Sequence, residues 1–216
     1  MITFIIPTIG RHTLIHTIES LYNQTNKEWR ANIIFDGIPC TIDKEALDHR
    51  IRVVEIDKKG VHINSAGLVR NIGITNCITD WVAFVDDDDI LSSRYVETFY
   101  DEIKKYTDIS VIIFRMFNEK PKGQYSYNNI LPGLITDNFY HQQTGISFVL
   151  KTTIFLEDDN WFIPSEEEDY LLLHNLRNKG YKIMISPYIR YFVEPSNMNV
   201  LEEFTTDLIV GNRVLI

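Results

Sequence analysis

The stretch Trp81-Val-Ala-Phe-Val-Asp-Asp-Asp-Asp-Ile-Leu91 indicates the fold class of this chain. Its apolar run, Val82 to Val85, is continuous rather than alternating, which is typical of a strand buried on both faces. The run stops at four consecutive carboxylates. Two unit charges about 6 Å apart interact by ~3 kcal/mol at an effective dielectric constant of ~20, so the four carboxylates need water or a cation to offset their repulsion.

The four carboxylates, Asp86 to Asp89, predict a metal site. Alternate residues of a strand face the same way, so Asp86 and Asp88 can converge on one point, while Asp87 and Asp89 face the other side. Carboxylate oxygens suit Mg²⁺ or Mn²⁺, which proteins often share with substrate phosphates. The end of a central strand is also where open α/β sheets bind ligands. A solvated acidic turn is the alternative, and the preceding buried strand favours the metal site.

Length, composition and charge limit the classes of protein to consider. The 216 residues allow one domain, and 44% hydrophobic residues supply an ordinary globular core. The formal net charge of −9 argues against nucleic acid or an anionic membrane as the main partner. Cys40 and Cys77 are too few for a disulfide framework. With no signal peptide and no transmembrane segment expected, we expect a cytoplasmic location.

The first half of the chain alternates strands with helices. Helical spacing begins after the first strand at Leu14, and further helices are expected over Asn64 to Thr75 and after Ser92 or Ser93. This alternation predicts βαβ units and a mainly parallel sheet flanked by helices. Besides the acidic strand, the expected strands are Ile2–Ile6 (ended by Pro7), Trp29–Phe35, Ile51–Ile56 and Ile109–Phe114.

The character of the sequence changes near Met116. A loop region rich in aromatic residues, with a possible hairpin, covers 118–136 and is followed by a strand over 145–150. Ser165 to Glu168 reads as a capping box, in which Ser165 accepts from the Glu168 amide and the Glu168 side chain reaches back. A helix then continues to Gly180. A last strand, Lys182–Ile185, and a C-terminal helix, Leu201–Val210, complete the expected elements.

Several segments, in this order and at this spacing, resemble family 2 glycosyltransferases over about residues 2–190. The resemblance implies a GT-A fold, Rossmann-like, with a nucleotide-binding half over about 1–115 and a smaller acceptor-side extension over about 116–216 of a single domain, 1–216. It also implies inverting transfer from a nucleotide-sugar, preferably a UDP-sugar, to a carbohydrate or glycoconjugate acceptor, assisted by Mn²⁺ or Mg²⁺. The segments are Phe4-Ile-Ile-Pro-Thr-Ile-Gly-Arg11, Ser20-Leu-Tyr-Asn-Gln-Thr25, Ile33-Ile-Phe-Asp-Gly37, Val69-Arg-Asn-Ile-Gly-Ile74, Phe84-Val-Asp-Asp-Asp-Asp-Ile-Leu91 and Glu168-Asp169.

The resemblance also implies roles for individual residues around the donor. Asp36 would contact the nucleotide base, although an Asp-Gly turn explains the same residue. Asp86 would hold the ribose or the metal, and Asp88 the metal and the diphosphate. Many GT-A enzymes place a further metal ligand, often His, near the C-terminal end, whereas the last histidine here is His174. The other expected donor-site residues are Pro7, Thr8, Arg11, Arg70 and Asn71, with a surface position open for Arg11 and a structural bond between helix and loop open for Arg70 and Asn71.

Asp169 is the expected catalytic base, since the resemblance assigns this position to the acceptor side. On the capping-box interpretation Glu168 is occupied by its own backbone, which leaves Asp169 free to face the cleft. The alternative role for Asp169 is to complement the helix dipole.

Two other functions share the pattern of a strand followed by Asp86-x-Asp88. Aspartate-nucleophile phosphatases need a Ser or Thr shortly after the second Asp, where this chain has Ile90 and Leu91. A non-catalytic sugar- or nucleotide-binding module could keep the fold without the reaction, but the presence of both acidic motifs counts against it. The oligomeric state stays open.

Overall fold

The computed structural model describes residues 1–59, 66–119, 129–132, 139, 144–195 and 213–216. The helices are α1 (Leu14–Tyr22), α2 (Ala66–Thr75), α3 (Tyr95–Lys105), α4 (Thr153–Leu156) and α5 (Glu168–Asn178), with a short 3-10 turn, η1, at Lys44–Ala46. The strands are β1 (Ile2–Thr8), β2 (Trp29–Asp36), β3 (Ile51–Ile56), β4 (Trp81–Phe84), β5 (Ile90–Leu91), β6 (Val111–Asn118), β7 (Ile130–Leu131), β8 (Phe148–Lys151), β9 (Ile183–Val193) and β10 (Val214–Leu215). They form a ten-stranded sheet in the order β10-β9-β6-β8-β4-β1-β2-β3, to which β5 and β7 add by pairing with β9 and β6.

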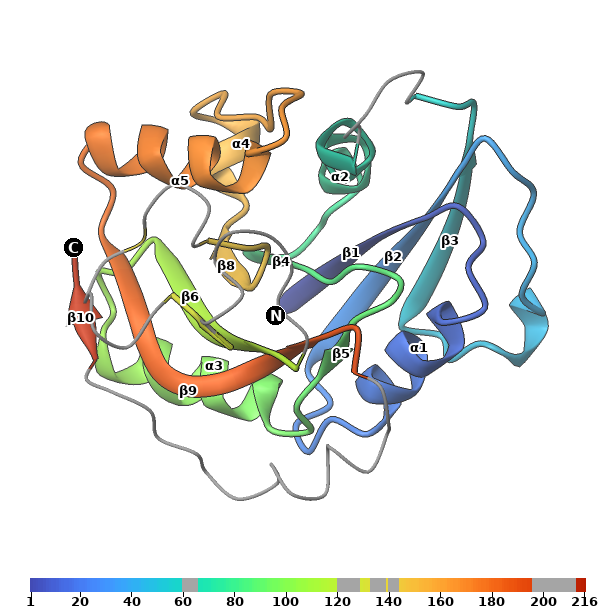
Figure 1. Ribbon diagram of the computed structural model, residues 1–216, viewed down its shortest axis with the longest axis horizontal. Coiled ribbons are helices and arrows are strands. Elements are labelled where there is room, and N and C mark those ends of the chain that lie inside the picture. The colour runs from blue at the N-terminus through green and yellow to red at the C-terminus, as the bar shows by residue number, and fades with distance from the viewer. Residues whose placement is uncertain (60–65, 120–128, 133–138, 140–143, 196–212) are drawn as a thin grey trace.

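The strands β4, β1, β2 and β3 are adjacent and parallel, as the alternation of strands and helices predicted. Helices α2, α4 and α5 lie on one side of the sheet, and α1 and α3 lie on the other (Figure 1). This cover explains why β1 and β4 are apolar without alternation, since both of their faces are almost wholly buried. Because the four strands are parallel, their carboxyl ends meet at one edge of the sheet.

The second half of the chain extends the same sheet. Strand β8 is antiparallel to both β4 and β6, and it lies between them. Strand β9 is parallel to β6 and antiparallel to β5, which places its end beside the chain that leaves the acidic loop. Strand β7 pairs with β6 in the antiparallel manner of the hairpin suggested by the sequence. The result is the predicted α/β architecture.

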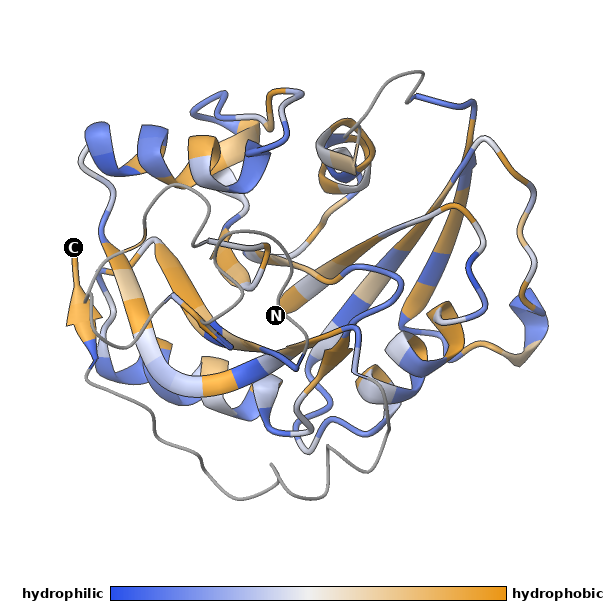
Figure 2. Ribbon diagram, viewed as in Figure 1, coloured by the Kyte–Doolittle hydropathy of each residue, from blue (hydrophilic) through white to orange (hydrophobic). Residues whose placement is uncertain are grey.

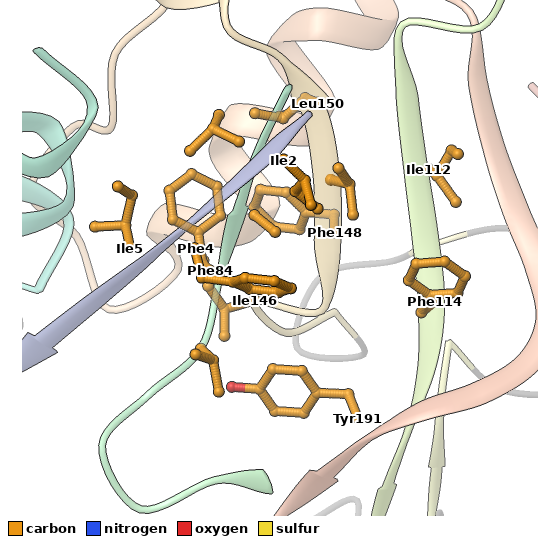
Figure 3. Close-up of a cluster of buried hydrophobic side chains, with 14 of the residues drawn as sticks. Ile2, Phe4, Ile5, Phe84, Ile112, Phe114, Ile146, Phe148, Leu150 and Tyr191 are labelled. Carbon is orange, nitrogen blue, oxygen red and sulfur yellow. The ribbon is translucent and has the colours of Figure 1, made fainter. Parts of the chain in front are cut away.

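The buried core contains side chains from both halves of the chain. In Figure 2 the hydrophobic residues follow the strands, while α5 carries many hydrophilic residues. Figure 3 shows Phe4 and Phe84 together with Phe148 and Leu150 from β8. The rings of Phe84 and Phe148 meet edge to face with their centroids 5.6 Å apart. Among the described residues, none of the helices has the length and apolar character needed to cross a membrane.

The sequence predicted that the first strand would end before Pro7. Strand β1 instead continues through Pro7 to Thr8. The Ile5 carbonyl accepts from the Val85 amide, so the backbone groups of Ile5 face β4. Alternate residues turn their backbone the same way, so the nitrogen of Pro7 also faces β4, beyond the end of that strand at Phe84. The missing amide hydrogen of Pro7 therefore removes no bond from the sheet.

Strand β9 is much longer than the expected Lys182–Ile185, because it passes through Pro187 and ends at Val193. The register between β6 and β9 shifts in this region, between the pairs Ile113–Ile185 and Arg115–Ile189. Such an irregularity accommodates a proline within a strand. The expected helix over Leu201–Val210 lies outside the described residues.

Candidate active site

A cleft of about 350 Å³ lies at the carboxyl ends of β1 and β2, beside the acidic loop that follows β4. This is the edge of the sheet at which the sequence predicted a ligand site. Arg70, Asn71, Asp88 and Asp169, the other predicted site residues, are not part of its wall. The lining residues are Pro7, Thr8, Ile9, Arg11, Asp36, Lys58, Ala66, Val69, Asp86 and Asp87.

The four carboxylates of the acidic loop, Asp86 to Asp89, divide into two partly exposed and two buried groups. The loop is a turn, closed by a bond of 3.1 Å from the Asp89 amide to the Asp86 carbonyl. The side chains of Asp86 and Asp88 are 35% and 23% exposed. Asp87 and Asp89 are buried, at 3% and 4%. Burial therefore alternates along the loop as predicted, although a turn rather than an extended strand produces it. The cleft itself is lined by Asp86 and Asp87, whereas Asp88 lines a neighbouring hollow.

The two buried carboxylates hold the loop in place. Asp87 accepts from the Thr8 hydroxyl at 2.6 Å and from the Arg11 guanidinium at 2.9 Å. Asp89 accepts from the Tyr191 hydroxyl at 2.6 Å and from the Glu194 amide at 2.9 Å. Burial, with the charge of Asp86 adding to it, raises the pKa of Asp89 well above its ordinary value.

Arg11 bridges two neighbouring carboxylates, because it also donates to Asp88 at 2.6 Å. Asp88 faces a second hollow of about 370 Å³, which is bounded by Arg11, His12 and Glu194 among others. Burial raises the pKa of Asp88, and the charges of Asp86 and Asp87 add to the effect against the opposing charge of Arg11. Negative charge at Asp88 is thus only partly compensated, even with Arg11 in contact.

Asp36 ends β2 and is buried in the wall of the cleft. Its carboxylate accepts from the Lys58 ammonium at 2.7 Å and from the Lys59 amide at 2.7 Å. Gly37 follows with φ of 77°, as an Asp-Gly turn requires. The expected turn is present, and the same carboxylate lines the cleft.

Arg70, on α2, is a buried cation surrounded by carboxylates. Its guanidinium donates to Asp86 at 2.6 Å and to Glu168, and it lies 3.7 Å from Asp169. Burial lowers the pKa of Arg70, but the charges of Asp86, Asp169 and Glu168 more than offset this, so its pKa is raised overall. Arg70 therefore links the acidic loop to the first turn of α5.

Asp169 lies in the first turn of α5 with its Oδ1 atom buried and without a hydrogen-bond partner among the described residues. Burial, with the charges of Asp86 and Glu168 added, raises the pKa of Asp169 to about 7 against the opposing charge of Arg70. A carboxylate with this pKa is suited to accept a proton near neutral pH.

The capping box predicted at Ser165 and Glu168 is wrong. Ser165 accepts from the Glu167 amide at 3.2 Å, and Glu168 turns to the interior instead of back to its own backbone. There it accepts from the Gly67 amide at 2.9 Å and pairs with Arg70. Gly67 and Arg70 lie about a hundred residues before Glu168, so local spacing cannot indicate them as partners. Their hydrogen bonds to Glu168 replace the expected cap.

Asn71 forms a reciprocal pair with the backbone of Phe162. Its amide nitrogen donates to the Phe162 carbonyl at 2.9 Å, and its oxygen accepts from the Phe162 amide at 3.1 Å. This is the structural bond between helix and loop that the sequence left open as an alternative to donor binding. It ties α2 to the segment that leads into α5.

The predicted metal ligands have the chemistry of a hard-cation site. Among the described residues, no group of three or more His, Cys, Asp or Glu side chains is placed to hold a metal ion. Within the part of the chain that the structure describes, Asp86 and Asp88 remain the candidate ligands. Both are hard oxygen donors with exposed surface, and such a pair fits Mg²⁺ or Mn²⁺ that completes its coordination with water and substrate phosphates.

Three contributors to the site were missed by the sequence analysis: Tyr191, Lys58 and Glu168 in its role as partner of Arg70. Tyr191 lies beyond the predicted end of the last strand, so its position was not anticipated. Lys58 follows the third strand, and the sequence analysis gave it no role. The rule that parallel strand ends converge could have indicated Lys58, since it follows β3 directly beside Asp36.

The α/β sheet, with a cleft and an acidic loop at its carboxyl edge, is of the predicted GT-A type. In agreement, S. aureus TarS has a similar structure, with a TM-score of 0.68 and 16% identity over 89% of this chain and 60% of the TarS chain. TarS in complex with UDP-GlcNAc gives a TM-score of 0.69 and 15% identity over 93% of this chain and 60% of that chain. At these identities the similarity concerns the fold.

Sequence comparison identifies the family. Residues 3–164 match the model of Glycosyl transferase family 2. The chain is 32% identical over 164 residues to Glycosyltransferase GlyA of Streptococcus pneumoniae, which covers 69% of this chain and 23% of GlyA. It is 25% identical over 159 residues to Glycosyltransferase GlyG of the same organism, covering 70% of this chain and 46% of GlyG. The chain thus spans less than half of either relative.

The chain belongs to glycosyl transferase family 2, as the resemblance predicted.

Proposed function

We propose that this domain transfers a sugar from a UDP-sugar to an acceptor hydroxyl with inversion, in dependence on Mn²⁺ or Mg²⁺. The observation that carries the proposal is Asp169, a carboxylate with its pKa raised to about 7 that Arg70 connects to the acidic loop. The fold neighbour TarS has been solved with UDP-GlcNAc and with UDP, which supports a UDP-sugar as the donor.

The donor would occupy the cleft at the carboxyl ends of β1 and β2. Asp36 would accept from the uracil N–H, and Pro7, Thr8 and Arg11 would form the adjacent wall. Asp86 and Asp88 would hold the metal, with Asp86 also near the ribose. When bound, the metal would neutralise the charge that develops on the leaving diphosphate.

Asp169 would act as the base. It would take the proton of the acceptor hydroxyl while that oxygen attacks the anomeric carbon from the face opposite the diphosphate, which accounts for inversion. Arg70 would keep the carboxylate oriented and lower its pKa against the effect of burial. Since the leaving group is a diphosphate, this scheme needs no carboxylic acid to protonate it.

The acceptor in this proposal is a carbohydrate or glycoconjugate. We also propose that both halves of the chain, 1–115 and 116–216, belong to one domain, because the described core contains side chains from both. Cys40 and Cys77 are free thiols, which accords with a cytoplasmic setting.

The test compares Asp169→Asn with wild type in Mn²⁺-dependent release of UDP from UDP-sugars, with water or a carbohydrate as acceptor. Loss of a general base lowers kcat by about 10²–10⁴. The affinity for UDP with Mn²⁺ should stay unchanged, because Asp169 is not part of the cleft wall.

Glu166→Gln is the matched control, since Glu166 is an exposed carboxylate of the same segment. It should keep normal turnover. If Asp169 instead only complements the helix dipole, Asp169→Asn should cost about 0.3–1 kcal/mol of stability and spare turnover. That outcome would remove Asp169 from the base role.

A further inference from the structure

The hydroxyl of Tyr191 joins the first and last carboxylate residues of the acidic loop. It donates to Asp89 Oδ2 at 2.6 Å and accepts from the Asp86 amide at 3.2 Å. The directions are fixed, because a backbone amide can only donate and the hydroxyl has one proton. We propose that Tyr191 and Asp89 are positioning residues, which hold the loop in the turn that presents Asp86 and Asp88 to the metal and the diphosphate. The inference rests on the proposed function.

Burial separates these two residues from the candidate ligands. Tyr191 is fully buried and Asp89 is 4% exposed, whereas Asp86 and Asp88 keep exposed surface. Asp89 therefore has no room for a metal and its water, although it belongs to the same run of carboxylates. Its role is to accept hydrogen bonds from the strand behind the loop.

The loop is tied to β9 at several points. The second oxygen of Asp89 accepts from the Glu194 amide at 2.9 Å, just after β9. Glu194 has φ of 36°, a conformation that costs energy for a residue other than glycine. The backbones of β5 and β9 also pair, with Leu91 opposite Tyr191. On the other side, the Thr17 hydroxyl of α1 donates to the Asp89 carbonyl at 2.8 Å.

Removal of the Tyr191 hydroxyl would leave both of its partners short of a buried hydrogen bond. The Asp86 amide would lose its acceptor, and Asp89 would lose a donor to its carboxylate. The turn would then compete with other loop conformations in which those groups reach water. When only a fraction of the molecules has the competent loop, the apparent affinity falls by that fraction.

Tyr191→Phe tests the inference, and Tyr95→Phe is its matched control. Tyr95 is also a fully buried tyrosine, but its hydroxyl has no hydrogen-bond partner among the described residues. Isothermal titration measures UDP binding with Mn²⁺ and again in EDTA. Tyr191→Phe should weaken the Mn²⁺-dependent affinity by about tenfold or more and leave the metal-free affinity unchanged. Tyr95→Phe should change neither.

Asp89→Asn gives a second route, which also serves if Tyr191→Phe does not fold. Its one amide oxygen cannot accept from both Tyr191 and Glu194 as the carboxylate does, so the same metal-dependent loss is expected. The double variant should lose less than the sum of the single losses, because both changes break one contact.

Unchanged Mn²⁺-dependent affinity in both single variants would overturn the positioning role. Equal weakening with Mn²⁺ and in EDTA would also overturn it, because the effect would then not concern the metal. Wild-type protein that binds UDP equally with and without Mn²⁺ would instead refute metal dependence in the proposed function, and this inference with it.

Discussion

Arg70 balances only part of the charge that surrounds it. Its guanidinium has five N–H donors, and it serves Asp86 and Glu168 directly while Asp169 lies at 3.7 Å. One cation cannot neutralise three carboxylates, so negative charge is left over beside Asp169. The excess negative charge adds to the effect of burial, and together they raise the pKa of Asp169 to about 7. Neither the burial of Asp169 nor its charged neighbours can be recognised from the sequence alone.

The raised pKa of Asp169 predicts how activity depends on pH. A base must be deprotonated, so kcat/KM should rise with pH and level off above about 7. A pH profile of UDP release between pH 5 and 9 checks this. A flat profile over that range would contradict a base with this pKa.

The same pKa predicts the opposite trend for stability. The folded state binds the proton of Asp169 more tightly than the unfolded state does. Protonation of Asp169 therefore stabilises the folded state fully below about pH 4, and this stabilisation is lost as pH rises through about 7. At 1.36 kcal/mol per unit, the shift from 3.8 to about 7 corresponds to at most about 4 kcal/mol. Asp169→Asn should therefore raise the melting temperature relative to wild type at pH 8 and hardly at pH 4.

At the level of elements, α2 connects the two halves of the site. Gly67, Arg70 and Asn71 all contact the segment from Phe162 to Glu168. Gly67 and Glu168 are close enough that a methyl group on Gly67 would meet the Glu168 carboxylate and lie 2.9 Å from the Phe162 Cβ atom. The start of α2 therefore has a glycine because α5 approaches it.

Gly67→Ala should destabilise the protein, against the usual trend. Alanine in a helix is favoured over glycine by roughly 0.5–1 kcal/mol. Here the added methyl group should cost about 1–3 kcal/mol through overpacking, and turnover should fall as Glu168 moves from Arg70. Urea unfolding and UDP release measure the two effects. Thr75→Ala, at an exposed position of the same helix, is the control and should be close to neutral.

A stabilised Gly67→Ala variant with full activity would contradict the close packing of α2 and α5.

The sequence predicted elements where the pattern is local. The continuous run before Asp86 and the helix ended by Gly180, which has φ of 82°, are of this kind. It did not predict the full length of β9, because Pro187 interrupts the pattern and only the pairing with β6 overrides it. Likewise, the local spacing of Ser165 and Glu168 gave no sign of Arg70.

For the molecule as a whole, the cleft was predictable because its wall comes from the ends of parallel strands. Asp36 ends β2 and Asp86 comes after β4, and the topology brings them to one edge. The approach of Asp169 was not predictable in this way, since it depends on how α5 packs against α2. Only the resemblance to family 2 glycosyltransferases indicated its side of the site.

Ligand binding should stabilise the entire fold by mass action. UDP with Mn²⁺ at about 100 times its dissociation constant should add ~2.7 kcal/mol, or about 5–10 °C in melting temperature for a chain of this length. EDTA should remove the metal-dependent part, and Asp88→Ala should behave in Mn²⁺ as wild type does in EDTA. Thermal shift measurements over this matrix give the result, and an equal shift in EDTA would exclude the metal.

The position of β8 has a consequence for motion. This strand comes from the second half of the chain, yet it lies in the sheet between β4 and β6, bonded to both. Two halves that interlock in this way cannot rotate about a hinge without breaking the middle of the sheet. We therefore expect the enclosure of substrates to come from loops at the carboxyl edge, over a sheet that stays rigid throughout the catalytic cycle.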